Sequence, residues 1–149
     1  NSVEFLSSRN DWYQGASMSD ALTATRDFLA GKRAVTYGSS MGGYAAISFS
    51  HALNADAFIA LSPQYSITPA WLAGIADARW AREASLISHH HDRIADGSNA
   101  AIPGLILHDN QHRLDREHAE ACARALKAAG ARRVDVLAVA IVVPGTFAE

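Results

Sequence analysis

One serine in the chain lies between two glycines, in the stretch VTYGSSMGGYAA at residues 35–46. Ser40 has Gly38 two residues before it and Gly42 two residues after it, which is a Gly-x-Ser-x-Gly spacing. A strand-like run precedes this motif and a small, apolar, helix-like run follows it. A turn that lifts a serine above a sheet is strained, and it requires very small residues at both flanking positions. The pattern therefore predicts a nucleophile elbow, with Ser40 as the nucleophile and the N–H of Met41 as an oxyanion donor.

Two other interpretations of this motif compete with the elbow. The spacing occurs by chance, and small residues at a strand-to-helix turn can serve packing alone; Gly43 would allow a second close approach of helix and sheet. A Gly-rich loop before a helix can also cradle a phosphate. However, the lysine of a phosphate loop does not follow, and GSSMGG lacks the Gly-x-Gly-x-x-Gly spacing of dinucleotide-binding loops.

The surrounding elements must hold Ser40 in place, and the sequence predicts an alternation of strands and helices. The helix at 17–29 has Ser17 or Ser19 as a cap and Gly31 as a stop, and the last helix begins at Asp115 as N-cap and ends at Gly130. An excursion, part helix and part loop, separates two strands at about 63–103. The predicted strands are 2–7, 33–38, 56–62, 104–109 and 133–143, and the predicted helices are 17–29, 41–53 and 115–130.

Nearly uniformly apolar strands that alternate with helices predict an α/β fold, a mostly parallel sheet with helices on both faces in three αβα layers. Functional groups of such sheets gather beyond the carboxyl ends of the strands. Four segments should meet at this rim: 38–41, 62–65, 108–112 and 143–146. Gln64 and Tyr65 are candidate pocket walls there, whereas Trp71 and Trp80 are expected to pack the excursion onto the body.

The loop after the first predicted strand also reaches this rim. Arg9, Asn10, Asp11, Trp12 and Tyr13 either line a pocket or form a polar loop that one buried aromatic anchors. Three successive histidines, His89 to His91, are expected to be a solvated segment, because adjacent side chains rarely converge on one metal ion.

Composition narrows the function further. With 149 residues the chain is expected to form one domain, 1–149, and its net charge of −2 gives no reason to expect a nucleic acid or an anionic membrane as partner. Cys122 is the only cysteine, which excludes an intrachain disulfide and fits a reducing, cytoplasmic compartment. No run is long and charge-free enough to span a bilayer, and the sequence from Asn1 onward leads us to expect no signal peptide. Since the chain begins at Asn1 with strand-like residues, its natural N-terminus is expected upstream.

These motifs carry a family resemblance. VTYGSSMGGYAA resembles the elbow of the α/β-hydrolase superfamily, and DAFIALSPQ, the excursion and GLILHDNQHRLDREHAEACARAL follow in a similar order over about residues 2–141. The resemblance implies a serine esterase or acyl-hydrolase that cleaves an ester or other acyl bond through an acyl-serine intermediate. It implies a small-molecule, glycan or acyl substrate and no metal or organic cofactor.

The resemblance also implies an acid and a histidine that follow the serine. Asp109, at the end of a predicted strand, is the preferred acid; Asp115, or no acid at all, is the alternative. The histidine should follow the last strand, but the segment VVPGTFAE contains none, and no histidine occurs after His118.

Three explanations for the absent histidine remain open. The base is encoded beyond Glu149, or another histidine replaces it, or the protein is a catalytically inactive scaffold that binds a ligand or partner. His108 and His112 are at the rim but are expected to be loop or supporting residues, and His118 is expected to serve the terminus of its helix.

Overall fold

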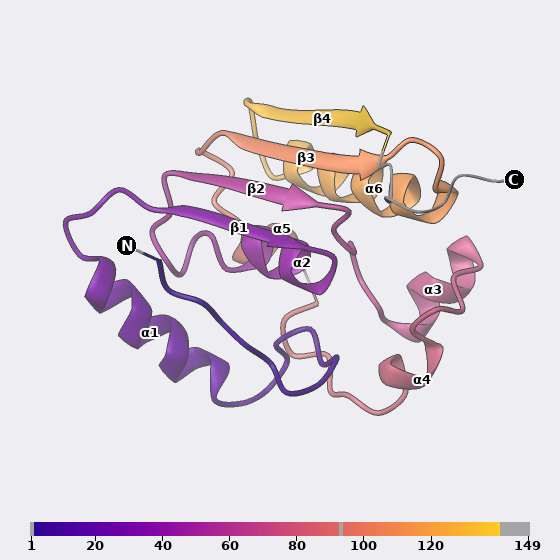
Figure 1. Cartoon of the computed structure of the whole chain (residues 1–149), viewed down its shortest axis with the longest axis horizontal. Helices are drawn as coiled ribbons and strands as arrows, with labels where there is room; N and C mark the ends of the chain where they lie inside the picture. The colour runs from indigo at the N-terminus through magenta and orange to yellow at the C-terminus, as the bar shows by residue number, and fades with distance from the viewer. Residues whose placement is uncertain (1, 93, 141–149) are drawn as a thin grey trace, which may run out of the picture.

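The computed structural model describes residues 2–92 and 94–140, and in this part of the chain four strands form one all-parallel sheet. The strands lie in chain order, β1 (Val35–Ser39), β2 (Ala57–Leu61), β3 (Gly104–Asp109) and β4 (Val134–Val139) (Figure 1). Ser39 pairs with Leu61, and Leu61 pairs with Leu107, so the carboxyl ends of the first three strands meet at one edge. The predicted parallel α/β sheet is confirmed.

Six helices accompany this sheet in the described part of the chain. They are α1 (Met18–Leu29), α2 (Met41–Ser48), α3 (Pro69–Ile75), α4 (Ala81–Ala84), α5 (Ile94–Gly97) and α6 (Arg113–Ala128). The predicted excursion is the segment between β2 and β3, where α3 and α4 lie beyond the carboxyl ends of the strands (Figure 1). None of the described helices is long and apolar enough to cross a membrane.

The core lies between one face of the sheet and the helices α2, α5 and α6. α2 contacts β1 and β2, α6 contacts β3 and β4, and α5 touches both helices. Phe58, Ala60 and Ile106 alternate along β2 and β3 toward these helices and are at most 1% exposed, beside the fully buried Ile47 and Leu126. Each large side chain buried in this way stabilises the fold by roughly 1.5–3 kcal/mol.

The opposite face of the sheet carries apolar side chains that remain open to solvent. Val35, Tyr37 and Leu137 are 58%, 68% and 50% exposed. Among the described residues, the helices that contact the sheet lie on the other face, and the second helical layer stays a prediction.

The predicted first strand, residues 2–7, is wrong. This segment is irregular, and Val3 and Leu6 are exposed. A strand requires a ladder partner, and the described part of the sheet pairs β1 only with β2. The alternating apolar residues instead lie along a groove formed with α1, β1 and α2, where Phe5 packs against Met18 and Phe49.

Helix boundaries also depart from the prediction in two places. α2 ends at Ser48 rather than near residue 53, and Phe49 is its C-cap. α6 begins at Arg113, and its N-cap is His112 rather than Asp115: the His112 Nδ1 accepts a hydrogen bond from the Asp115 N–H at 3.3 Å. An imidazole can fill this position because any acceptor that reaches the third helical N–H satisfies it. Gly130 follows the C-cap Ala129 of α6 and has φ +96°, so the prediction that this glycine terminates the helix is confirmed.

Candidate active site

Ser40 alone forms the turn between β1 and α2, because β1 ends at Ser39 and α2 begins at Met41. Its backbone has φ 55° and ψ −118°, a conformation that residues other than glycine rarely adopt. The turn is held from both sides: the Ser40 N–H donates to the Leu61 carbonyl at 2.8 Å, and the Tyr44 N–H donates to the Ser40 carbonyl at 3.0 Å. Strain of this kind costs about 1–3 kcal/mol and persists only where surrounding structure enforces it.

The glycines around Ser40 differ in what they permit. A Cβ at Gly38 would collide with the backbone of Gly42, and a Cβ at Gly43 would lie 3.0 Å from the Leu61 carbonyl oxygen and 3.1 Å from the Pro63 Cα. The predicted need for a small residue at Gly38 is confirmed, and so is the predicted close approach of helix and sheet at Gly43. The predicted need for a small residue at Gly42 is wrong, because a Cβ there meets nothing within 4 Å. The backbone of Gly42 lies so close to Gly38 that position 38 has no room for a side chain. At position 42 a side chain would point into open space.

The side chain of Ser40 lies against the carboxamide of Gln64. The Gln64 Nε2 is 3.0 Å from the Ser40 Oγ, and the Gln64 Oε1 is 3.3 Å from it. The Trp12 indole N–H donates to the same Oε1 at 3.2 Å. Gln64, predicted as a pocket wall, therefore touches the serine itself and is only 3% exposed.

The loop of residues 9–13 covers the elbow and is anchored by a buried aromatic. Trp12 is 1% exposed, its backbone N–H donates to the Met41 Sδ at 3.3 Å, and its ring packs edge-to-face with that of Trp80 at a centroid distance of 5.1 Å. Arg9 and Asn10 are exposed. Trp80 packs the excursion onto the body, as predicted, and Trp71 does so as well, through Tyr65 and His118.

Met41 opens helix α2, so its N–H has no acceptor within that helix. The first N–H groups of a helix carry a partial positive charge and stabilise a neighbouring anion. An oxyanion that forms on a group attached to Ser40 would lie next to this N–H.

The two candidate acids have different surroundings. Asp109 ends β3, is partly buried, and accepts a hydrogen bond from the Gln111 N–H at 2.9 Å. The Asp115 carboxylate instead forms an ion pair with Arg79 at 2.9 Å and lies 3.2 Å from the His112 Nδ1. Asp115 thus has a structural role in the first turn of α6, and Asp109 is the better candidate acid.

None of the seven histidines, all of which belong to the described residues, hydrogen bonds to Ser40. His108 is 5% exposed and its Nδ1 lies 3.1 Å from the Asp109 carbonyl oxygen, and His112 caps α6. The successive histidines of the excursion diverge: the His89 Nε2 lies 3.1 Å from the Ala84 carbonyl oxygen, whereas the His91 ring packs edge-on against Phe49. Within residues 2–92 and 94–140, no group of three or more metal-ligating side chains converges.

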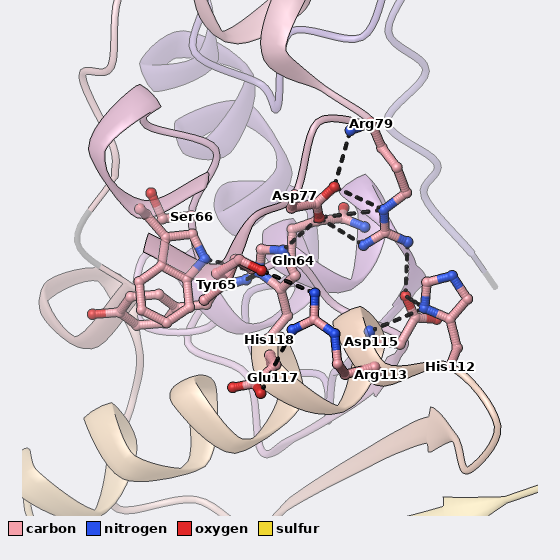
Figure 2. A network of polar contacts seen from close by, with 12 residues as sticks. Gln64, Tyr65, Ser66, Asp77, Arg79, His112, Arg113, Asp115, Glu117 and His118 are labelled. Atoms are coloured by element: carbon pink, nitrogen blue, oxygen red, sulfur yellow. Dashed lines mark hydrogen bonds and ion pairs between the residues drawn. The ribbon is translucent and has the colours of Figure 1, made fainter. Parts of the chain in front are cut away.

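His118 lies in the middle of a buried polar network and does not serve a helix terminus, which corrects the prediction for this residue (Figure 2). Its Nδ1 accepts from the Tyr65 N–H at 2.9 Å and from the Trp71 indole N–H at 3.3 Å. The ring is therefore neutral with its proton on Nε2, which donates to the Asp77 Oδ2 at 3.2 Å. Because both nitrogens are engaged, His118 is unsuited to act as a general base for Ser40.

Arg79 completes this network (Figure 2). Its guanidinium contacts both oxygens of Asp77, at 2.8 to 3.2 Å, and also reaches Asp115. Burial alone would raise the pKa of Asp77, but the hydrogen bonds and charge of Arg79 and the hydrogen bond of His118 outweigh it and lower that pKa to about 2. Burial is the main cause that lowers the pKa of His118. The sequence gives no signal for this network, because Arg79 reaches Asp115 and Asp77 reaches His118 across 36 and 41 positions of the chain.

We expect the free energy of unfolding to fall in two steps as the pH is lowered. The His118 contribution is complete above the ordinary histidine pKa of 6.5 and is lost below it, because the unfolded chain takes up the proton more readily. The Asp77 contribution is complete above its ordinary pKa of 3.8 and is lost as the pH falls through about 2. The second step should amount to about 2 kcal/mol.

Urea unfolding at a series of pH values measures both steps. Asp77→Asn should remove the lower step and His118→Gln the upper one. Parallel curves for wild type and Asp77→Asn between pH 4 and pH 2 would contradict the assignment to Asp77.

Comparisons of the chain with protein-family models, with curated proteins and with solved structures found no match. Geometry and chemistry therefore carry the functional conclusion.

Proposed function

We propose that this protein is a serine-dependent hydrolase of the α/β-hydrolase type, with Ser40 as the nucleophile. The observation that carries the proposal is the strained one-residue turn at the carboxyl end of β1, which presents Ser40 directly before a helix. A packing turn would not require a serine at φ 55° and ψ −118°, whereas a nucleophile elbow does.

The order of the strands supports the same proposal. The chain runs from the elbow strand β1 through β2 to β3, which ends in Asp109. Neighbouring strands lie about 4.8 Å apart, so β1 and β3 are separated by roughly 10 Å at the rim. Side chains that lean toward each other from these two strands would leave room for one imidazole between Ser40 and Asp109. The segment after β4, where the resemblance places a histidine, contains none, and residues 141–149 lie outside the described residues.

The proposed reaction transfers an acyl group in two stages. The Ser40 Oγ forms a bond to the acyl carbon while its proton passes to a general base, the C–O bond to the leaving alcohol breaks, and that alcohol takes the proton. Water then attacks the acyl-serine, gives its proton through the same base to Oγ, and releases the acid. The N–H of Met41 stabilises the oxyanion in both stages. The substrate class is an ester or another acyl compound on a small molecule or a glycan.

Labelling with a fluorophosphonate tests this function directly. The Ser40 Oγ would displace fluoride from phosphorus, and mass spectrometry of the digested chain should find a single adduct on the peptide that contains Ser40. An adduct elsewhere, or none, would contradict the proposal; complete lack of labelling together with saturable ligand binding would instead indicate an inactive scaffold.

A further inference from the structure

The carboxamide of Gln64 has a defined orientation at Ser40. An indole N–H can only donate, so the atom of Gln64 that Trp12 contacts must be the oxygen Oε1. With the oxygen assigned in this way, Nε2 is the nearer of the two carboxamide atoms to Ser40, at 3.0 Å from Oγ against 3.3 Å for Oε1. Gln64 therefore donates an N–H to the serine oxygen.

The backbone around Gln64 holds this orientation. The segment leaves β2 through Ser62, which has φ 40° and whose N–H donates to the Leu107 carbonyl at 2.7 Å. The next residues place Gln64 at 3% exposure beneath Trp12, and the Tyr65 N–H is tied to His118. A buried amide without partners would destabilise the fold by about 1–3 kcal/mol, whereas here the Gln64 oxygen is satisfied by Trp12 and its nitrogen by Ser40.

We propose that Gln64 is a further catalytic residue, a neutral hydrogen-bond donor to the Ser40 Oγ, and that Trp12 is its positioning residue. This inference rests on the proposed hydrolase function. The N–H that points at Oγ occupies one lone pair of the oxygen. The Ser40 Oγ also lies 3.3 Å from the Gln64 Oε1, so its O–H turns away from that acceptor when it donates to a base. As the proton leaves, negative charge develops on Oγ, and the Gln64 N–H stabilises it. The amide takes no proton and does not replace the base. When water releases the acyl group, the same N–H stabilises Oγ as the leaving atom.

The test measures the rate of fluorophosphonate labelling across a range of pH for wild type, Gln64→Met and Trp12→Phe. Gln64→Met keeps the length of the side chain and removes the donor, and should slow labelling about 100-fold. Trp12→Phe keeps an aromatic ring but removes the indole N–H, which frees the amide to turn, and should slow labelling about 10-fold. In both variants the profile should move to higher pH, because the serine hydroxyl loses a donor that favours its anion. A purely structural role would leave the position of the profile unchanged.

Gln111→Met is the matched control. Gln111 is exposed at the same rim, where its side chain bonds only its neighbour Asn110, so labelling should remain at the wild-type rate. Labelling of Gln64→Met within threefold of wild type, with the profile in place, would overturn the role of Gln64. A Gln64→Met variant that does not fold leaves the decision to Trp12→Phe, which retains the glutamine: an unchanged profile there overturns the proposal.

A measurement without activity separates this inference from the proposed function. In ¹⁵N-labelled protein, the side-chain amide signal of Gln64, identified by its absence from Gln64→Met, should shift in Ser40→Ala. If the fluorophosphonate does not react with wild type at all, the hydrolase proposal and the catalytic role of Gln64 both fail. If the fluorophosphonate reacts with wild type but the Gln64 amide signal does not shift in Ser40→Ala, the role of Gln64 alone is overturned.

Discussion

Replacement of Ser40 by alanine is expected to abolish fluorophosphonate labelling, with a loss of about 10⁴-fold or more. The substitution removes the only atom that can bond to phosphorus while the turn, Met41 and Gln64 stay in place. Ser39→Ala is the matched control, because Ser39 is the adjacent exposed residue at the end of β1. Its rate should match that of wild type. Loss of labelling in Ser39→Ala alone would move the nucleophile by one residue and contradict the elbow.

The stability of variants at position 40 should depend on whether the new residue can adopt the backbone conformation of the turn. Ser40→Gly and Ser40→Ala both remove the hydrogen bond to Gln64, but only glycine adopts φ 55° and ψ −118° without strain. We expect Ser40→Gly to be more stable than Ser40→Ala by about 1 kcal/mol, although glycine is the weaker residue in ordinary helical or extended structure. Urea unfolding of the two variants measures the difference. Equal stabilities would show that the turn stores no strain at Ser40.

Gly38→Ala should destabilise the protein by about 3 kcal/mol, the upper end of what inserted methyl groups cost in a packed region. Its Cβ would collide with the Gly42 backbone, so β1 and α2 would have to separate. Gly42→Ala is the control from the same motif, because its Cβ has free space and lies within a helix. The free energy of unfolding of Gly42→Ala should equal that of wild type or exceed it by up to about 1 kcal/mol, because alanine favours the helix.

Chemical denaturation of both glycine variants separates the two positions. If Gly38→Ala and Gly42→Ala unfold at the same urea concentration, the close approach of β1 and α2 does not limit the turn.

The strands β1 to β4 were predictable from sequence because each is a short apolar run between breakers, and burial of such runs dominates local preference. Residues 2–7 show the same pattern but do not form a strand, because pairing depends on a neighbour that local sequence does not specify. The start of α6 was misassigned for a related reason. Aspartate is a common N-cap residue, which favoured Asp115, yet the side chain that accepts the helix N–H is that of His112.

Some features of the candidate site were also predictable from sequence, and others were not. The Ser40 turn was predictable because its neighbours in sequence are also its neighbours in space. The sequence predicted that Gln64 and Ser40 lie at the same rim of the sheet. It did not predict their contact, because the direction of a side-chain amide depends on residues distant in the chain. The pairing of Asp77 with His118 could not be foreseen, because it joins the excursion to α6 across 41 positions of the chain.

This pairing has a consequence for the entropy of the long connection between β2 and β3. The closure entropy of a loop grows only with the logarithm of its length, at about 0.6 kcal/mol for each doubling. The contacts of His118 with Tyr65, Trp71 and Asp77 fasten the first part of the connection to α6, so its remainder behaves as a shorter loop. Changes in length between Tyr65 and Asp77 should therefore disturb the rim around Ser40. The stretch of the excursion next to the serine is thus one whose length the fold constrains.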